Sequence, residues 1–247
     1  MDVAAGCAGD QGAHGGAVPP GSCLADSSKS GLDPPAAGTP GKGAGRESDS
    51  DVGGQGLAAG KKNARRQRAW IVFEDESGVS DRPPIRTTWA PKGRTPVVTH
   101  PYHWKKVSVA GALAYRWDGR RCRLLFQTKP DSYNTAALIR FLRQLRRHFR
   151  GKKVILIWDR LNAHKSKEMA HYLARQRQWL QVEWLPAYAP DLNPVEMLWG
   201  NVKGQEIANL EVEDTLDVVD GLCVGLRRAR RRNLGFSFLQ HAGLSFV

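Results

Sequence analysis

Runs of apolar residues alternate with polar segments along most of the chain, and the first three runs predict strands. Ala69–Phe73 is wholly apolar and is followed by acidic residues, a pattern typical of a buried strand. Val107–Tyr115 and Arg121–Thr128 are joined by a segment with an Asp-Gly pair at 118–119, which favours a tight turn. We therefore expect the second and third strands to pair antiparallel.

Apolar residues at helical spacing begin after the third strand. Ser132 is the expected N-cap of this first helix, and Gly151 is its expected end. Strands and helices alternate from there on. They are expected, in order, as a strand at Lys153–Trp158, a helix at Ser166–Gln178, a strand at Gln181–Leu185, a helix from Pro194 and a helix near Asp214–Arg231.

This order of three strands, helix, strand, helix, strand and helix predicts an α/β fold. A hairpin followed by βαβ crossovers gives a mixed five-stranded sheet with helices on both faces. The same element order is found in the RNase H-like fold, and we expect that fold here. Element order alone does not establish a function.

Residues 1–60 differ from the rest of the chain in composition. They contain no Phe, Trp or Tyr and hold 15 of the 26 glycines. A segment with so few large apolar groups cannot offset the entropy of ordering, so we expect it to be disordered and not a functional domain. We expect the α/β domain over residues 61–210, with a C-terminal helix and basic tail at 211–247 packed on it.

Charge divides the chain at the same place. Residues 1–60 hold three Lys or Arg against seven Asp or Glu; since the whole chain carries +13, residues 61–247 carry +17. Such a surface attracts a polyanion, and DNA is the obvious candidate; the alternative is a solvated basic surface with no partner. Candidate DNA contacts cluster at the end of the first predicted helix (Arg146, Arg147, Lys152) and at residues 227–232.

The cellular location is predicted from what the sequence does not contain. No apolar run reaches the roughly 18 residues needed to span a membrane, and the N-terminus lacks the basic start and apolar core of a signal peptide. The four cysteines form no close pair typical of a zinc or redox motif. We expect a cytoplasmic protein associated with the nucleoid.

Three carboxylates stand at positions that the predicted sheet can bring together. Asp75 follows the apolar part of the first strand, Asp159 ends the fourth, and Glu196 lies in the first turn of the helix after the fifth. Phosphoryl transfer on DNA uses such a cluster, because carboxylates can hold two Mg²⁺ ions about 3.5–4 Å apart. The positions therefore suggest a metal-dependent active site.

Each of these residues also has a structural interpretation. Asp159 suits a turn after a strand, and the tetrapeptide at 193–196 suits a capping box in which its glutamate folds back onto the helix start. Asp75 stands between Glu74 and Glu76, which share one face of a strand while Asp75 points to the other. The interpretation as a site depends on all three carboxylates together.

Four segments resemble the conserved blocks of a known family. FEDESG (73–78), WDRLNAHKS (158–166) and LPAYAPDLNPVEMLW (185–199) are similar to the signature blocks of DDE transposases in the Tc/mariner superfamily. TWAPKGRTPVV (88–98) is similar to a further block of its bacterial insertion-sequence-630 branch. The resemblance covers about residues 61–209, and 36 residues separate Asp159 from Glu196, close to the spacing of that superfamily.

The resemblance implies a role for each matching residue. Asp75, Asp159 and Glu196 become the catalytic metal ligands for two Mg²⁺ ions, for which Mn²⁺ could substitute. His164 is implied to touch DNA or the scissile phosphate, with a helix cap as the alternative, and Lys203 to contact a phosphate. Trp199 is expected in the core and not as a DNA-stacking residue.

The resemblance also implies a function and partners. It implies Mg²⁺-dependent DNA strand cleavage and strand transfer in cut-and-paste transposition, by a homodimer acting on transposon ends and target DNA. Family members carry helix-turn-helix domains before the first strand; here we expect a separate helix-turn-helix polypeptide from an upstream frame, or a truncated copy. Two rival functions stay open: an RNase H-like nuclease without strand transfer, and a catalytically silent DNA-binding relic.

Overall fold

A computed structural model of the protein describes residues 60–98, 105–186 and 189–245. Five strands form one sheet in the order β3-β2-β1-β4-β5. β1 pairs antiparallel with β2, and β2 with β3, whereas β1, β4 and β5 run parallel. The predicted mixed five-stranded sheet is confirmed. Its strands are β1 (Trp70–Ser80), β2 (Lys106–Arg116), β3 (Cys122–Pro130), β4 (Val154–Trp158) and β5 (Leu180–Trp184).

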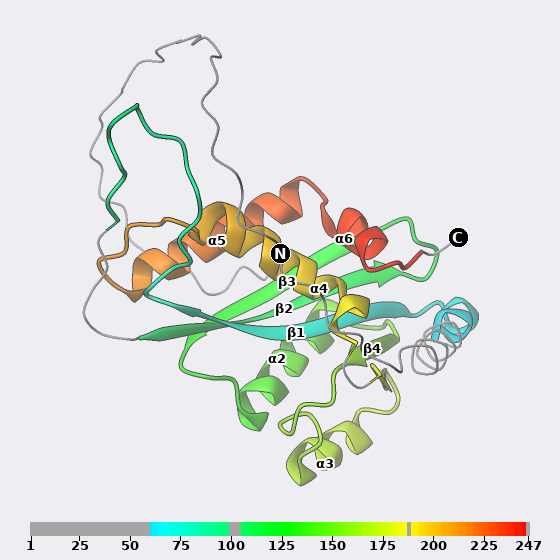
Figure 1. Ribbon diagram of the computed structural model, residues 1–247. Helices are drawn as coiled ribbons and strands as arrows, with labels where there is room; N and C mark the ends of the chain where they lie inside the picture. The colour runs from blue at the N-terminus through cyan, green and yellow to red at the C-terminus, as the bar shows by residue number, and fades with distance from the viewer. Residues whose placement is uncertain (1–59, 99–104, 187–188, 246–247) are drawn as a thin grey trace, which may run out of the picture.

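Helices cover both faces of this sheet, as expected from the sequence (Figure 1). α2 and α3 lie on one face, and α4, α5 and α6 lie on the other. The helical elements are α2 (Thr135–His148), α3 (Lys167–Arg175), η1 (Pro190–Leu192), α4 (Pro194–Val202), the π-helical turn η2 (Lys203–Ile207), α5 (Thr215–Arg231) and α6 (Gly235–His241).

Two apolar cores result, one on each side of the central strand β1. Phe73 packs with α4 and α5 residues such as Leu222 on one side, while Val72 packs with α2 and α3 residues such as Leu142 and Met169 on the other. Successive side chains of a strand point to opposite faces, and a strand covered on both faces reads as a continuous apolar run. This explains the unbroken hydrophobicity of Ala69–Phe73.

The sheet opens partway along β1. Parallel pairing with β4 joins Trp70–Phe73 to Val154–Ile157 and then stops, whereas the antiparallel pairing with β2 continues to Ser80. Beyond Phe73, β1 therefore has a ladder partner on one side only. Asp75 in β1 and Asp159 after β4 both come just beyond the point where the pairing of the two strands ends.

Side chains cap the starts of α2, α3 and α5, and the predicted cap of α2 is wrong. The N-cap of α2 is Asn134, whose Oδ1 accepts from the Ala137 N–H at 2.9 Å, and not Ser132. α3 is capped by Ser166, the residue at which the sequence placed the start of this helix, and α5 begins after Asp214 in a capping box with Asp217. α2 ends at His148, and Gly151 lies two residues beyond its C-cap with a φ of +72°.

Two helical segments were not predicted. α6 packs back on β2, where the Tyr115 hydroxyl donates to the Gly235 carbonyl oxygen at 2.6 Å. Residues 60–67 are also helical and bury Ala64 completely. The predicted disorder of residues 1–60 otherwise falls outside the described residues, and the division at residue 210 stays a prediction. No helix in the described part of the chain is both long and apolar enough to cross a membrane.

Candidate active site

Asp75 lies on the α4 side of β1, just past the point where β4 ends. It is directly opposite Gly111 in the β1–β2 ladder and is 7% exposed. Its Oδ2 accepts a hydrogen bond from the indole N–H of Trp199, on α4, at 2.8 Å. Its neighbours Glu74 and Glu76 lie on the opposite face, as strand alternation predicts. Asp75 therefore presents one carboxylate oxygen that is held by the protein and one that is not.

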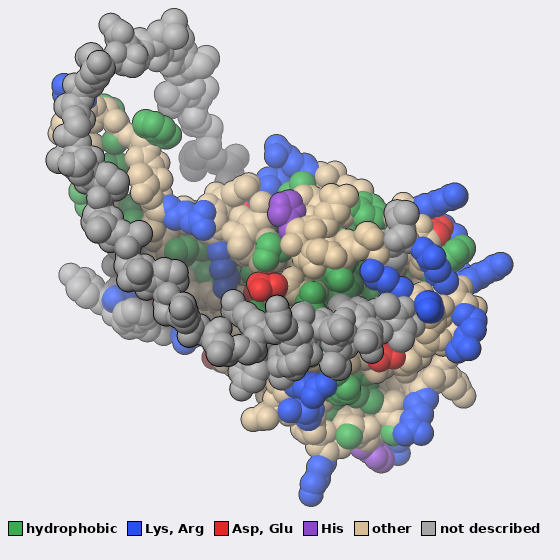
Figure 2. Space-filling model, turned by 45° about the vertical axis from the view of Figure 1, so that its right-hand side comes forward, with side chains coloured by type: hydrophobic (Ala, Val, Ile, Leu, Met, Phe, Trp, Pro, Cys, Tyr) green, Lys and Arg blue, Asp and Glu red, His purple; other side chains and the backbone are tan. Residues whose placement is uncertain are grey.

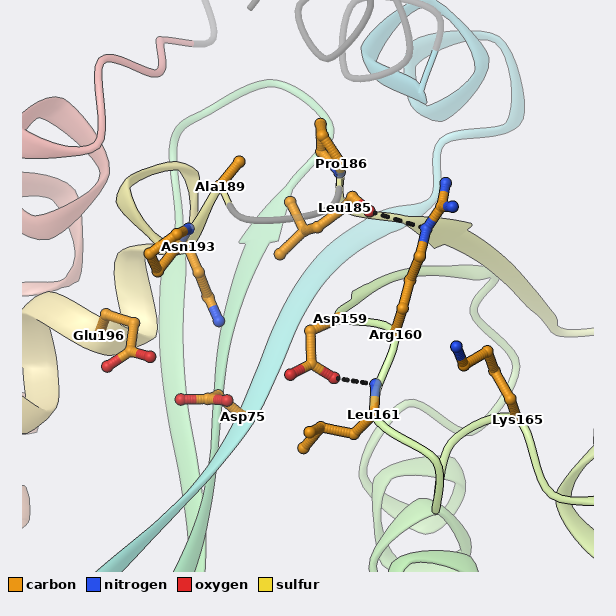
Figure 3. A pocket seen from close by; sticks show the side chains of 11 residues that line it. Asp75, Asp159, Arg160, Leu161, Lys165, Leu185, Pro186, Ala189, Asn193 and Glu196 are labelled. Atoms are coloured by element: carbon orange, nitrogen blue, oxygen red, sulfur yellow. Dashed lines mark hydrogen bonds between the residues drawn. The ribbon is translucent and has the colours of Figure 1, made fainter. Parts of the chain in front are cut away.

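Asp159 follows the last residue of β4 and is held in a similar way. Its Oδ1 accepts from the Leu161 backbone N–H at 3.1 Å and lies 2.6 Å from Nδ1 of His164. Both contacts fall on the same oxygen. Figure 3 shows the second oxygen turned toward Asp75. The turn that sequence reasoning offered as an alternative is present, and it orients the carboxylate.

Glu196 lies in the first turn of α4, but it does not cap the helix. The Asn193 side chain caps it, since its Oδ1 accepts from the Val195 N–H at 3.2 Å. The Asn193 N–H, which a capping box would direct to Glu196, donates instead to the Pro190 carbonyl oxygen at 2.8 Å. The carboxylate of Glu196 is thereby left to face solvent and the sheet.

The three carboxylates meet in one cleft of about 450 Å³. In Figure 3 the carboxylates of Asp75 and Glu196 lie side by side and that of Asp159 faces them. The wall opposite α4 carries two basic side chains, Arg160 and Lys165. The cleft is completed by Leu161, Leu185, Pro186, Ala189, Pro190 and Asn193.

The electrostatic environment differs between the two aspartates of the cleft. Burial, followed by the charge of Glu196, raises the pKa of Asp75 to about 7, against the opposing hydrogen bond from Trp199. Burial also acts to raise the pKa of Asp159, but its hydrogen bonds to His164 and Leu161 outweigh burial and lower it. Buried and clustered carboxylates of this kind gain from a bound cation.

The donor set suits a hard divalent cation. Three carboxylates supply oxygen ligands, and at Asp75 and Asp159 one oxygen is occupied by a fixed donor while the other stays available. Mg²⁺ and Mn²⁺ prefer oxygen ligands and need coordination positions open for water and phosphate. The residues present therefore fit the metal pair implied by the sequence resemblance.

A family model described as DDE superfamily endonuclease matches residues 70–217, more than half of the chain. The chain belongs to the DDE superfamily endonucleases. A search of curated proteins finds no match.

Solved structures of the Mos1 mariner transposase have a similar fold. Its strand transfer complex matches at 16% identity and a TM-score of 0.52, over 86% of this chain and 68% of that one. Its paired-end complex with the left transposon end matches at 19% identity and 0.51, over 86% and 67%. Its paired-end complex with Mn matches at 17% and 0.50, over 82% and 66%. This likeness confirms the predicted RNase H-like fold of the endonuclease.

The structure corrects the expected position of His164 in this endonuclease. The residue is 1% exposed, and its ring is enclosed between Asp159, Glu76 and Trp158. Direct contact with DNA was expected, but a buried ring cannot make it. The alternative role as a helix cap is also not observed, because Ser166 caps α3. The sequence shows only that a histidine stands five residues after Asp159. It does not show which residue the second ring nitrogen of that histidine contacts.

Lys203 begins the π-helical turn that continues α4. Burial lowers its pKa, while the nearby charges of Glu196 and Asp75 oppose that effect. Its ammonium group thus feels the field of two of the three carboxylates, although it does not line the cleft itself. The position is compatible with the phosphate contact expected from the sequence.

The basic cluster of Arg146, Arg147 and Lys152 lies elsewhere. These residues line a hollow of about 620 Å³ together with Phe149 and Trp179, where α2 ends and β4 begins. Since Asp159 follows the other end of β4, this cluster and the cleft are at opposite ends of that strand. Figure 2 shows Lys and Arg side chains spread along several margins of one face and not gathered in a single patch.

Part of the second predicted basic cluster is structural. The Arg228 guanidinium pairs with Glu206 and donates to the Asn201 amide oxygen at 2.6 Å. Arg230 donates to the Leu124 carbonyl oxygen at 3.1 Å and lies over the Phe126 ring. These two arginines join α5 to η2 and to β3, so fewer charges at 227–232 are available to DNA than the sequence suggested.

Sequence reasoning missed the hydrogen-bond partner of Asp75. Trp199 is in the core as expected, but its bond to Asp75 was not foreseen. The available signal was Gly111, because a glycine within a strand often marks the close approach of another group. A Cβ at Gly111 would lie 2.5 Å from Cη2 of Trp199.

Proposed function

We propose that this chain is the catalytic part of a cut-and-paste DNA transposase of the Tc/mariner superfamily, in the insertion-sequence-630 branch. The observation that carries the proposal is the convergence of Asp75, Asp159 and Glu196 in one cleft. The Mos1 complexes with similar folds contain paired transposon ends and a strand-transfer product, which supports DNA as the substrate.

Asp75, Asp159 and Glu196 would hold two Mg²⁺ ions, or Mn²⁺ in their place. Such a pair, when bound, activates the attacking oxygen and stabilises the leaving oxygen of an in-line displacement at phosphorus. The protein contributes fixed ligand geometry, because Trp199 and the Leu161 N–H restrain the two aspartates. Glu196 completes the set from a separate helix.

The basic side chains on the margin of the cleft would hold the DNA backbone. Arg160 and Lys165 line it, and Lys203 lies within electrostatic reach of Glu196. Phosphate contacts position DNA without reading its sequence. In this proposal, recognition of the transposon ends belongs to a separate helix-turn-helix polypeptide.

Homodimer formation is part of the same proposal. The described residues that follow β1, up to residue 98, project from the body of the molecule (Figure 1). Trp89 is fully exposed, Val97 is 86% exposed and Ile85 is 73% exposed. Exposed apolar side chains gathered on one projection are typical of a surface that binds another protein.

The test uses the full chain, divalent metal and duplex oligonucleotides that carry the element's terminal repeat, uncut or already cut at the 3′ end. Asp159→Asn and Glu196→Gln should each abolish Mg²⁺-dependent cleavage while leaving DNA binding intact, because a metal site that loses one ligand fails as a unit. Glu168→Gln, which removes an exposed carboxylate of α3, is the matched control and should cleave like the wild type.

The two substrates separate the proposal from its rivals. A transposase should join the pre-cut 3′ end to target DNA, whereas a nuclease should cut the uncut substrate and join nothing. A chain that binds DNA but performs neither reaction in Mg²⁺ or Mn²⁺ would be a silent relic. Cleavage by Glu196→Gln at the wild-type rate would show that the active site is elsewhere.

A further inference from the structure

His164 connects the candidate metal ligand Asp159 to a carboxylate on the other face of the sheet. Its Nδ1 lies 2.6 Å from Oδ1 of Asp159, and its Nε2 lies 3.1 Å from Oε1 of Glu76. The ring stacks on Trp158, with centroids 3.9 Å apart and planes 22° from parallel. Contacts on both edges and one face leave the imidazole a single orientation.

The partners determine what the two ring nitrogens do. An ionised carboxylate can only accept hydrogen bonds, so an imidazole held between two carboxylates donates from both nitrogens. Glu74, Glu76 and His164 offer ligand atoms within 4.8 Å of one another, but both ring nitrogens of His164 already face carboxylate oxygens.

Glu76, and not Glu74, is the carboxylate in contact with His164. Glu74 is 1% exposed, and no group in the described part of the chain hydrogen-bonds to either of its oxygens.

The consequence for Asp159 follows from which oxygen is used. Oδ1 receives both the Leu161 N–H and the His164 contact, and these come from two points of the loop after β4. Two donors on one oxygen fix the rotation of the carboxylate about its Cβ–Cγ bond. Oδ2 is thereby held toward Asp75, as Figure 3 shows.

We propose that His164 and Glu76 are positioning residues, and that the Asp159–His164–Glu76 bridge holds Oδ2 of Asp159 in place for a divalent cation. The inference rests on the proposed function. It means that Glu76, on the opposite face of the sheet, helps to orient a ligand of the metal site through His164. Hydrogen-bond partners of metal ligands commonly change metal affinity or activity by about 10–100-fold when removed.

Paired substitutions separate the bridge from general damage to the core. His164→Ala and Glu76→Ala remove it. His164→Asn keeps an N–H donor close to the position of Nδ1, and Glu76→Gln keeps an oxygen that can accept from Nε2. His171→Asn, at an exposed histidine of α3, is the matched control. Circular dichroism and thermal melts establish which variants fold.

Mn²⁺ binding to each full-length variant, measured by calorimetry, needs no catalytic activity. The two alanine variants should bind Mn²⁺ about 10-fold or more weakly, and Glu76→Gln should stay within about threefold of wild type. His164→Asn, which keeps the donor to Asp159 but not the contact with Glu76, should bind less weakly than His164→Ala. The Mg²⁺ concentration for half-maximal cleavage should shift in the same order. The cleavage rate at saturating Mg²⁺ should change less.

Two outcomes would overturn the proposal. Loss of Mn²⁺ binding in Glu76→Gln as severe as in Glu76→Ala would make Glu76 a metal ligand itself. Unchanged binding in a folded His164→Ala variant, or in Glu76→Ala if the former does not fold, would show that Asp159 needs no bridge.

Histidine side-chain ¹H–¹⁵N spectra keep this proposal separable from the proposed function. His164, assigned through its loss in His164→Asn, should show a hydrogen-bonded proton on Nδ1, the nitrogen that faces Asp159. Absence of that proton would contradict the bridge even in an active enzyme. A wild-type chain that shows this N–H group but neither binds Mn²⁺ nor cleaves DNA would refute the proposed function and the positioning role, while leaving the contact itself in place.

Discussion

The ring of Trp199 lies over Gly111, where a Cβ would come within 2.5 Å of Cη2, and its N–H reaches Asp75 from there. Gly111 is the residue opposite Asp75 in the ladder. The missing side chain on β2 thus makes room for the hydrogen bond from Trp199 that orients Asp75.

This relationship predicts the effect of Gly111→Ala. The added methyl group must displace the indole, and overpacking of this kind costs about 1–3 kcal/mol of stability. We expect a lower melting temperature together with at least about 10-fold slower cleavage, since the partner of a metal ligand is lost. Gly78→Ala is the control, because a Cβ there meets nothing within 4 Å. Equal effects of the two substitutions would contradict this account.

Trp199→Phe tests the hydrogen bond without the change in volume. The ring stays, but buried Asp75 loses its donor, which costs about 1–3 kcal/mol. Cleavage should fall about 10-fold or more. Wild-type kinetics in Trp199→Phe would mean that packing alone places Asp75.

The raised pKa of Asp75 predicts how the metal-free protein responds to pH. Between the ordinary value of 3.8 and about 7, the folded protein keeps a proton that the unfolded chain has released, so stability falls as pH rises through this window. In EDTA at pH 8, the free energy of unfolding of Asp75→Asn should therefore exceed that of wild type by up to on the order of 4 kcal/mol. The variant should also have the higher melting temperature.

The same thermal melts in Mg²⁺ test whether Asp75 binds the cation. Mg²⁺ should raise the melting temperature of wild type and not of Asp75→Asn. The difference in melting temperature between the two proteins should therefore become smaller. Asp220→Asn, an exposed position on α5, should follow wild type in both conditions. A variant that melts below wild type in EDTA would show that Asp75 is not under electrostatic strain.

Removal of residues 2–59 should leave the melting temperature unchanged, because that segment has no aromatic residue to contribute to a core. A longer deletion to Arg68 should lower it, since Ala64 is completely buried. Thermal melts of the two shortened proteins check this. A drop of several degrees with the shorter deletion would refute the predicted disorder.

DNA binding should be independent of sequence and steeply dependent on salt. Log affinity should fall with log salt by about 0.9 per phosphate neutralised. Replacing Arg146, Arg147 and Lys152 with Ala should reduce that slope without unfolding the protein, because the three side chains line an open hollow. Arg228→Ala should instead lower stability, since it leaves Glu206 without its partner. Fluorescence anisotropy over a salt series measures the slopes, and an unchanged slope in the triple variant would place the DNA elsewhere.

The sequence by itself determined the mixed five-stranded sheet and the antiparallel pairing of β2 with β3. Continuous apolar runs at β1 and β4 and the Asp-Gly turn between β2 and β3 are local patterns with few structural solutions. α6 was missed because a seven-residue helix has too few turns for a clear period. The helical residues 60–67 were missed because they lie where the composition changes.

In the candidate site, the sequence predicted the metal ligands but not the residues that hold them. The positions of the three carboxylates followed from strand ends, a helix start and the family blocks, all of which are local in sequence. Their supports did not, because the Trp199–Asp75 and His164–Glu76 contacts join residues 124 and 88 positions apart. Strand register and helix packing alone bring such residues together. Only the tertiary structure could therefore decide that His164 faces inward to Asp159 and not outward to DNA.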